Sequence, residues 1–166
     1  MPLIIASSIL SKRLSNIAVN NPDTTILSGE AYRYVMYKEI EVGSINVVAK
    51  NNDWKKALPL LIEEYKRAME HGFTESELKE AAANILNSYE NRVKSSNTRK
   101  SAEIASSILY NYHNNTVYST PQTDLDIIRD ALDSITPEMC HQAFLSFWST
   151  PDIHLTLTTS DKMVTP

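Results

Sequence analysis

The four histidines are the side chains of this sequence best suited to hold a metal ion or to move a proton: His71, His113, His141 and His154. A helical zinc site needs two histidines about four positions apart, so that both face the ion from one side of the helix. No two of these histidines lie within five residues of each other. The sequence therefore offers no local zinc-binding pair.

The other candidates for catalysis have simpler structural explanations. His71 is expected to complement the dipole at the C-terminus of a helix. Cys140 and His141 are neighbours on a predicted helix and point in different directions, so we expect a buried thiol beside a surface imidazole. The serine pairs 7–8 and 106–107 have no histidine and acid at a useful spacing, so a serine nucleophile is not supported.

The composition is typical of one soluble globular domain: 166 residues, 42% hydrophobic, 22% charged and a net charge of −4. The chain has no basic block, so we expect no nucleic-acid partner. Its apolar runs are far shorter than the roughly 20 residues that span a bilayer, so we expect no membrane segment. The single cysteine excludes an internal disulfide, and the three glycines form no phosphate-binding loop.

A tight corner between two long helices organises the chain. Gly72 lies where a helix commonly ends in a left-handed residue. Thr74 and Glu77 have the spacing of a capping box, in which each side chain bonds the other residue's backbone N–H. Two helices joined this closely must pack on each other or on one shared sheet.

The hydrophobic pattern and the start and stop signals predict the remaining elements. Helices are expected over Leu3–Val19, from Asp53 to the corner, over Thr74–Lys94 and Arg99–His113 (capped by Thr98), and after Thr120-Pro121 and Thr136-Pro137; strands are expected over Thr24–Lys38, Gly43–Lys50 and Ile153–Thr159. We expect the first strand to be partly covered on both faces and to form a hairpin with the second through a turn at 39–42.

The predicted fold is α+β, in the order α-β-β-α-α-α-α-α-β, with a small antiparallel sheet of about three strands covered on one face by about six helices. Residues 1–159 form a single partial domain and 160–166 a tail. Three strands are few for so much apolar helix, and the chain begins directly in an apolar helix. Both features predict that partner strands are missing and that the chain is cut from a longer protein.

A set of spaced residues resembles the second half of a domain of the insulinase/pitrilysin-type zinc metallopeptidases. The residues are Gly43 to Lys50, Trp54, Ala57-Leu58, Glu64, Arg67, Gly72-Phe73-Thr74 and Glu77-Leu78, with Leu10 to Ile17 before them and Ile135 to Glu138 after them. The resemblance implies a segment of a larger antiparallel sheet with helices on one face. It also implies that two or four such domains enclose a peptide.

The resemblance further implies a zinc ion in an active parent, held by H-x-x-E-H on a helix and by a glutamate from a later helix. H-x-x-E-H is absent here, and the matching later helix has Asn84 and Asn87 seven residues after Glu77 and Glu80. We therefore expect no metal site in this chain. Glu80 and Glu90 are kept as alternative ligands, although an exposed helix face is the simpler explanation for both.

Four residues are candidates for contact with a peptide substrate. Tyr32 and Tyr34, with Tyr37, could line an edge at which a peptide adds as a strand, although ordinary sheet packing also explains them. Arg13 and Arg33 could bind acidic groups, although a solvated arginine is the default.

These observations predict a non-catalytic half-domain that helps to form the peptide-enclosing chamber of a zinc protease. The alternatives are a scaffold or assembly subunit of an inactive relative, and an unrelated helical interaction domain. The expected partners are the remaining domains of the parent and, through the parent, a peptide, and the isolated chain is expected to self-associate. A bacterial parent would be soluble and periplasmic or secreted.

Overall fold

The computed structural model describes residues 1–20, 23–36, 40–149 and 153–159. These residues form an α+β fold, which confirms the predicted class. The elements are α1 (Pro2–Asn20), β1 (Ile26–Met36), β2 (Ile40–Ala49), η1 (Lys50–Asn52), α2 (Trp54–His71), α3 (Glu75–Lys94), η2 (Ser96–Thr98), α4 (Ser101–His113), α5 (Pro121–Asp133) and α6 (Pro137–Trp148). Each predicted helix is present, with boundaries within a few residues of those expected.

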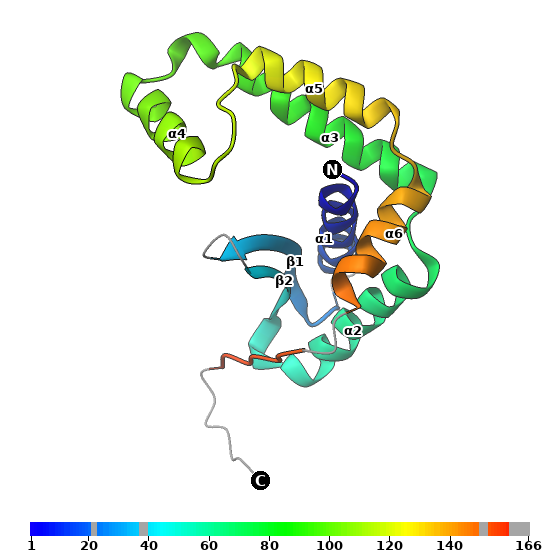
Figure 1. Ribbon diagram of the computed structural model, residues 1–166. Helices are drawn as coiled ribbons and strands as arrows, with labels where there is room; N and C mark the ends of the chain where they lie inside the picture. Colours follow the sequence, from blue (N-terminus) through cyan, green and yellow to red (C-terminus); the bar gives the residue numbers. More distant parts are fainter. Residues whose placement is uncertain (21–22, 37–39, 150–152, 160–166) are drawn as a thin grey trace.

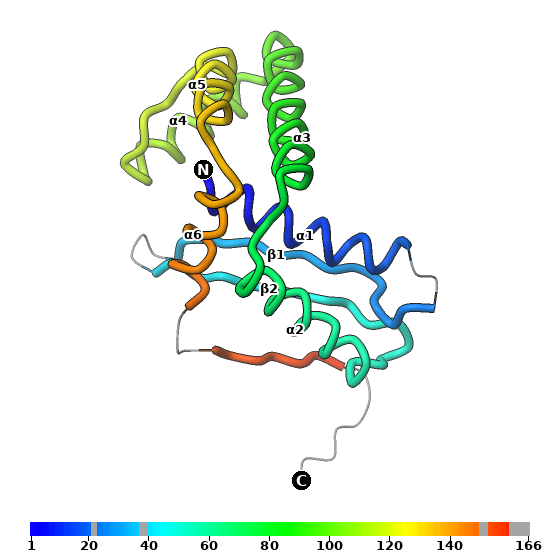
Figure 2. The backbone as a smooth tube through the Cα atoms, turned by 90° about the vertical axis from the view of Figure 1, so that its right-hand side faces the viewer, coloured from blue at the N-terminus to red at the C-terminus, as the bar shows by residue number. Residues whose placement is uncertain are grey.

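The helices curve around a single β-hairpin (Figure 1). The long helix α1 lies along β1, and α6 and α2 continue the curve beside it. The paired helices α3 and α5 then extend away from the hairpin and carry α4 at their far end (Figure 2). The chain therefore has a body built on the hairpin and an arm built from α3, α4 and α5.

The hairpin buries one face and exposes the other. Its antiparallel register pairs Gly29 with Val47 and Ala31 with Ile45, and these residues face α1. A Cβ atom on Gly29 would lie 2.7 Å from Cβ of Leu14, so this glycine allows helix and strand to approach closely. The opposite face of β1 is exposed along its length. The expectation that both faces of the first strand are partly covered is therefore wrong, because none of the described residues forms a layer over the second face.

Helix α1 also bonds the free edge of β1. The Oγ atom of Ser11 accepts a hydrogen bond from the Ala31 N–H at 2.7 Å and donates one to the Ala31 carbonyl at 2.9 Å. One turn later, Ser15 Oγ donates to the Gly29 carbonyl at 3.2 Å. These hydroxyl groups satisfy backbone groups that an edge strand would otherwise leave open to another strand.

The hydrophobic core lies where α1, α6 and the helical corner meet. Ile5, Leu10 and Leu14 of α1 are fully buried, as is Phe144 of α6. The Phe73 ring packs edge-on against Phe144, with the ring centroids 5.5 Å apart. Each such aliphatic or aromatic side chain contributes about 1.5–3 kcal/mol through burial, so α1 is the central support of the body.

The helical corner has the predicted capping box, and its glycine has the predicted positive φ but not the ψ of about +47° of a left-handed helical residue. Gly72 ends α2 with φ of 66° and ψ of −139°, a region that favours glycine. The capping box is confirmed: Glu77 N–H donates to Thr74 Oγ1 at 3.3 Å, and Thr74 N–H donates to Glu77 Oε2 at 2.8 Å. A Cβ atom on Gly72 would lie 2.7 Å from Cγ of His141, so the corner also depends on close contact with α6.

The predicted third strand is wrong. In the described part of the chain the sheet has two strands, and residues 153–159 join neither of them in a ladder. Figure 2 shows this segment extended below the hairpin. Ile153 and Leu155 are exposed, so the alternating pattern that predicted a strand has no covering layer here. The predicted turn at 39–42 is also corrected, because β2 already begins at Ile40, and Glu39 lies outside the described residues.

Two helix starts differ from the sequence prediction. Thr98 belongs to η2, and the residue before α4 is Lys100. Asp53 precedes α2 as expected, but its carboxylate pairs with Lys56 at 2.7 Å instead of capping the helix. Thr98 Oγ1 instead donates to the Ser95 carbonyl at 2.8 Å.

Candidate functional site

The histidines do not meet in space to form a metal site. In the described part of the chain, no group of three His, Cys, Asp or Glu side chains lies close enough to hold an ion. His71 is exposed in the last turn of α2. His141 is partly buried instead of lying freely on the surface, because its Nε2 atom is 2.9 Å from the Met69 carbonyl oxygen. His141 thus joins α6 to the end of α2.

Cys140 is a structural residue of the core. It is fully buried, as predicted, and this burial raises the pKa of its thiol to about 11. A nucleophilic cysteine needs the opposite change, a lowered pKa and partial exposure. The Cys140-His141 pair therefore has the wrong properties for a catalytic dyad.

The two alternative zinc-ligand glutamates each pair with a cation. Glu80 of α3 lies 3.2 Å from Lys12 of α1, and Glu90 lies 3.8 Å from Arg129 of α5. Both carboxylates lie on exposed parts of the helix surface. These residues do not present the dry, convergent set of ligands that a zinc site requires.

Arg13 lies inside the helical corner. Its Nε and Nη2 atoms donate to the two oxygens of Glu77 at 2.6 and 2.9 Å, and Nη2 also donates to the Gly72 carbonyl at 2.9 Å. Partial burial raises the pKa of Glu77, but the hydrogen bonds from Arg13 and Thr74 outweigh it and lower the pKa from 4.5 to about 2. The Arg13 side chain is only 14% exposed, so its role in this structure is to hold α1 on the corner.

The remaining candidate substrate residues lie on two different faces of the hairpin. Tyr32 and Tyr34 lie on the exposed face, with their ring centroids 5.9 Å apart, and Asn46 Nδ2 donates to Tyr32 Oη at 3.2 Å. Arg33 points to the opposite face and pairs with Glu41 at 2.6 Å. The tyrosines form one aromatic surface that could lie against a peptide or another sheet, and Arg33 is not part of it. Tyr37 lies outside the described residues.

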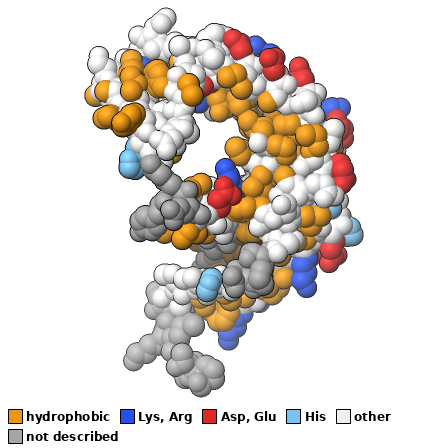
Figure 3. Space-filling view, in the orientation of Figure 1, with side chains coloured by type: hydrophobic (Ala, Val, Ile, Leu, Met, Phe, Trp, Pro, Cys, Tyr) orange, Lys and Arg blue, Asp and Glu red, His pale blue; other side chains and the backbone are white. Residues whose placement is uncertain are grey.

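The inner side of the curve is more hydrophobic than the outer rim. Figure 3 shows hydrophobic side chains over α4 and in a band along the inside of the curve, whereas most of the visible Lys, Arg, Asp and Glu side chains lie on the outer edge, apart from one basic and one acidic side chain in the opening of the curve. Helix α4 has no buried residue. The helical spacing of Ala102, Ala105, Ile108, Leu109 and Tyr112 places them on one apolar face and predicts that they face a core. The structure contradicts this prediction: Tyr112 is 83% exposed and Leu109 67%. The amphipathic pattern is real, but the described chain supplies nothing to cover it.

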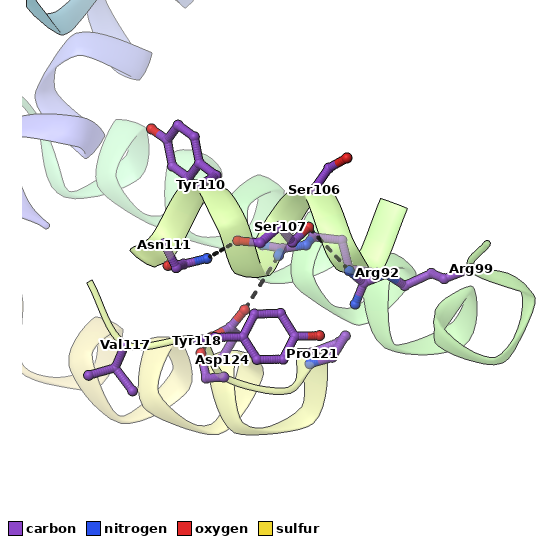
Figure 4. A pocket seen from close by; sticks show the side chains of 11 residues that line it. Arg92, Arg99, Ser106, Ser107, Tyr110, Asn111, Val117, Tyr118, Pro121 and Asp124 are labelled. Carbon is purple, nitrogen blue, oxygen red and sulfur yellow. Dashed lines mark hydrogen bonds and ion pairs between the residues drawn. The ribbon is translucent and has the colours of Figure 1, made fainter. Parts of the chain in front are cut away.

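A cavity of about 610 Å³ lies in the arm, between the end of α3, one side of α4 and the start of α5 (Figure 4). Its lining includes Arg92, Arg99, Ser107, Tyr118 and Asp124. Sequence reasoning missed this cavity because it tested Ser106 and Ser107 only as nucleophiles. The sequence feature that could have indicated the cavity is the spacing of Arg92 and Arg99, seven positions apart, with the serine pair 106–107 seven positions further on.

Comparison of the sequence with known proteins assigns no family, since no family model and no curated protein matches this chain.

In the described part of the chain, no helix is both long and apolar enough to cross a membrane.

Comparison with solved structures identifies the fold. The chain is similar to the periplasmic protease PqqL from Escherichia coli, with a TM-score of 0.82 and 18% identity over 89% of this chain. It is also similar to the first half of PqqL (TM-score 0.78, 19% identity, 86% of this chain). A third match is a protein described as a predicted insulinase family protease from Yersinia pestis (TM-score 0.71, 11% identity, 92% of this chain). The chain thus has an insulinase-type fold.

The chain spans only part of each of these structures: 16% of PqqL, 30% of its first half and 35% of the Yersinia pestis protein. The likeness therefore concerns one segment of a larger protein. It takes in about nine-tenths of this chain in each comparison.

Proposed function

We propose that this chain is a non-catalytic half-domain of a zinc metallopeptidase-like protein, in which it forms part of the wall that encloses a peptide. The observation that carries the proposal is the match of nearly the whole chain to one segment of two larger proteins, PqqL and the Yersinia pestis protein, each described as a protease. The spaced residues noted in the sequence lie on α1, β2, α2, α3 and the start of α6, or directly beside these elements. A fold can host several functions, so the role of the segment is argued from its surfaces.

The distribution of apolar surface supports a wall segment with other parts of a protein on its inner side. The inside of the curve is mostly hydrophobic, and most of the charged side chains visible in Figure 3 lie on the outer rim. Soluble proteins rarely leave large continuous apolar areas in water unless a partner covers them. The hairpin also has few strands for independent stability. Strands and helices from the rest of a parent protein would cover both features.

The side chains of this segment do not suit a catalytic zinc ion, which would belong to another part of an active parent. H-x-x-E-H is absent from the sequence. Glu77 and Glu80 lie on the helix that the sequence resemblance equates with the later ligand helix, and they are paired with Arg13 and Lys12. We therefore assign no catalytic step to this chain.

The proposal is tested with the purified chain. Zinc content after dialysis against ZnCl₂ and cleavage of a fluorogenic peptide mixture are measured together. We expect less than stoichiometric zinc and no cleavage above a heat-denatured control. Cleavage that a chelator abolishes and added zinc restores would overturn the proposal.

A scaffold subunit of an inactive relative is the second candidate function, and the lack of a metal-binding group in the described residues is compatible with it. The presence or absence of H-x-x-E-H in the rest of the parent sequence separates the two. The unrelated helical domain is less compatible with the structure, because it does not account for the antiparallel hairpin.

A further inference from the structure

We propose that the cavity in the arm binds a small organic anion, with Arg99 pairing with its carboxylate or phosphate group and Tyr118 contacting its flat apolar part. This inference does not depend on the proposed protease role. It rests on the size of the cavity, on its arginines and on the partners of those arginines. At about 610 Å³, the cavity has the size of pockets that hold small molecules.

The charged groups that line the cavity favour an anion. Two arginines and one carboxylate, Asp124, line it. Arg92 Nη2 lies 3.4 Å from Asp124 Oδ2, which is a long contact for an ion pair between a guanidinium and a carboxylate. Asp124 also accepts a hydrogen bond from Ser119. The carboxylate is therefore engaged by Arg92 and Ser119, which leaves the second arginine as the surplus positive charge.

Arg99 is that surplus charge. It lies at the end of η2, and in the part of the chain that the structure describes the polar contact of its guanidinium is from Nη2 to Ser107 Oγ at 3.4 Å. The Ser107 hydroxyl donates to the Glu103 carbonyl at 2.9 Å, so it is held with its oxygen toward Arg99. Arg99 is only partly exposed. A guanidinium in a polar cavity with one weak neutral acceptor has several donors left for a carboxylate or phosphate.

The remaining lining supplies a surface for the rest of the ligand. Figure 4 shows the Tyr118 ring below the arginines, beside Pro121 at the start of α5. Asn111 Nδ2 donates to the Ser107 carbonyl at 2.8 Å and thereby fixes the side of α4 that borders the cavity. The N-terminus of α5 adds a favourable dipole for an anion on the same side. The cavity thus combines a cationic end with an aromatic wall.

The experiment is a titration of the purified chain with phenyl phosphate and with benzoate, followed by NMR of the arginine side chains and the backbone amides around Ser107. Inorganic phosphate and benzyl alcohol are the probes that lack the ring and the charge, respectively. We expect saturable shifts with both aromatic anions, weaker binding of inorganic phosphate and none of benzyl alcohol. If neither phenyl phosphate nor benzoate bound saturably, the proposal would be overturned.

Variants locate the site. Arg99→Ala should weaken phenyl phosphate binding about 10-fold or more, and Arg99→Lys should restore part of it, because lysine keeps the charge but not the fork of donors. Asp124→Asn should strengthen binding by removing the competing carboxylate. Arg129→Ala is the matched control, since Arg129 pairs with Glu90 and Asp126 away from the cavity lining. Equal binding by the wild type and Arg99→Ala, with circular dichroism showing both folded, would contradict the assignment.

Discussion

Arg13 of α1 and Glu77 of α3, which are 64 positions apart in the sequence, form a bidentate ion pair with N–O distances of 2.6 and 2.9 Å. The same carboxylate also completes the capping box with Thr74. A residue that begins a helix is thus also the point at which the first helix is attached to the helical corner. The Glu77 carboxylate therefore stabilises both the start of α3 and the contact between α1 and α3.

The Glu77 pair should make stability depend on pH. The pKa of Glu77 is lowered in the folded state, from 4.5 to about 2, so its contribution is present above the unfolded pKa and is lost as pH falls toward the folded value. We expect Glu77→Gln to cost about 1–2 kcal/mol at pH 7, less than the full shift implies because water partly screens the pair. The cost should shrink between about pH 5 and pH 2.

Urea unfolding of both proteins across this pH range measures the effect. Glu80→Gln is the control, because Glu80 pairs with Lys12 on the exposed surface and should change stability by less than about 1 kcal/mol. A Glu77→Gln cost that stays constant from pH 7 to pH 2 would show that the carboxylate charge is not the cause.

Gly72→Ala should destabilise the chain by two separable causes. Its positive φ strains a side-chain-bearing residue, and the added Cβ would meet the His141 ring at 2.7 Å. We expect a loss of about 2–4 kcal/mol. Adding His141→Ala to Gly72→Ala should recover part of this loss by removing the ring, whereas the backbone strain remains. Additive costs in the double variant, measured by urea unfolding, would exclude the steric contact.

Ser11→Ala should weaken the attachment of α1 to the hairpin. It removes the hydroxyl that bonds both the N–H and the carbonyl of Ala31 at the strand edge. We expect a cost of about 1–3 kcal/mol, because these groups are partly buried and would lose their partner. Ser8→Ala, one turn earlier on α1, is the comparison. If Ser11→Ala cost no more than Ser8→Ala, the edge bonds would contribute nothing to stability.

Exposed apolar residues of α4 should drive association without contributing to the stability of the chain. Leu109→Ser with Tyr112→Ser should change the unfolding free energy by less than about 0.5 kcal/mol, because both side chains face water. The same double variant should lower the self-association seen by light scattering. Leu14→Ala, in the core, should instead cost about 2–5 kcal/mol. A wild-type chain that stays monomeric at millimolar concentration would contradict the expected association.

Local signals in the sequence predicted local structure well. Gly72 and the Thr74–Glu77 box lie within six positions and fix the corner through their own backbone conformation and hydrogen bonds. The predicted helices, and the α+β class, follow from periodicities of the same short range. The resemblance to insulinase-type proteases was carried by spaced residues on these elements, and the fold comparisons agree with it.

Features that depend on distant partners could not be predicted. Nothing near Arg13 in the sequence indicates Glu77, and nothing near Ala31 indicates Ser11. The alternation in 153–159 and the amphipathic pattern of α4 describe surfaces suited to burial, but a pattern does not state whether the covering layer is in the same chain. The cavity at Arg99 likewise arises only when α3, α4 and α5 meet.

The central claim is that the inner side of this segment is covered by the rest of a larger protease-like protein. Hydrogen–deuterium exchange of α4 and the hairpin, in the isolated chain and in the parent protein, tests it most directly. We predict that the backbone amides of α4 and of the hairpin β1–β2 exchange at least about 10-fold more slowly in the parent than in the isolated chain. Equal exchange rates in the two proteins would mean that these surfaces face water in both, and would contradict the account.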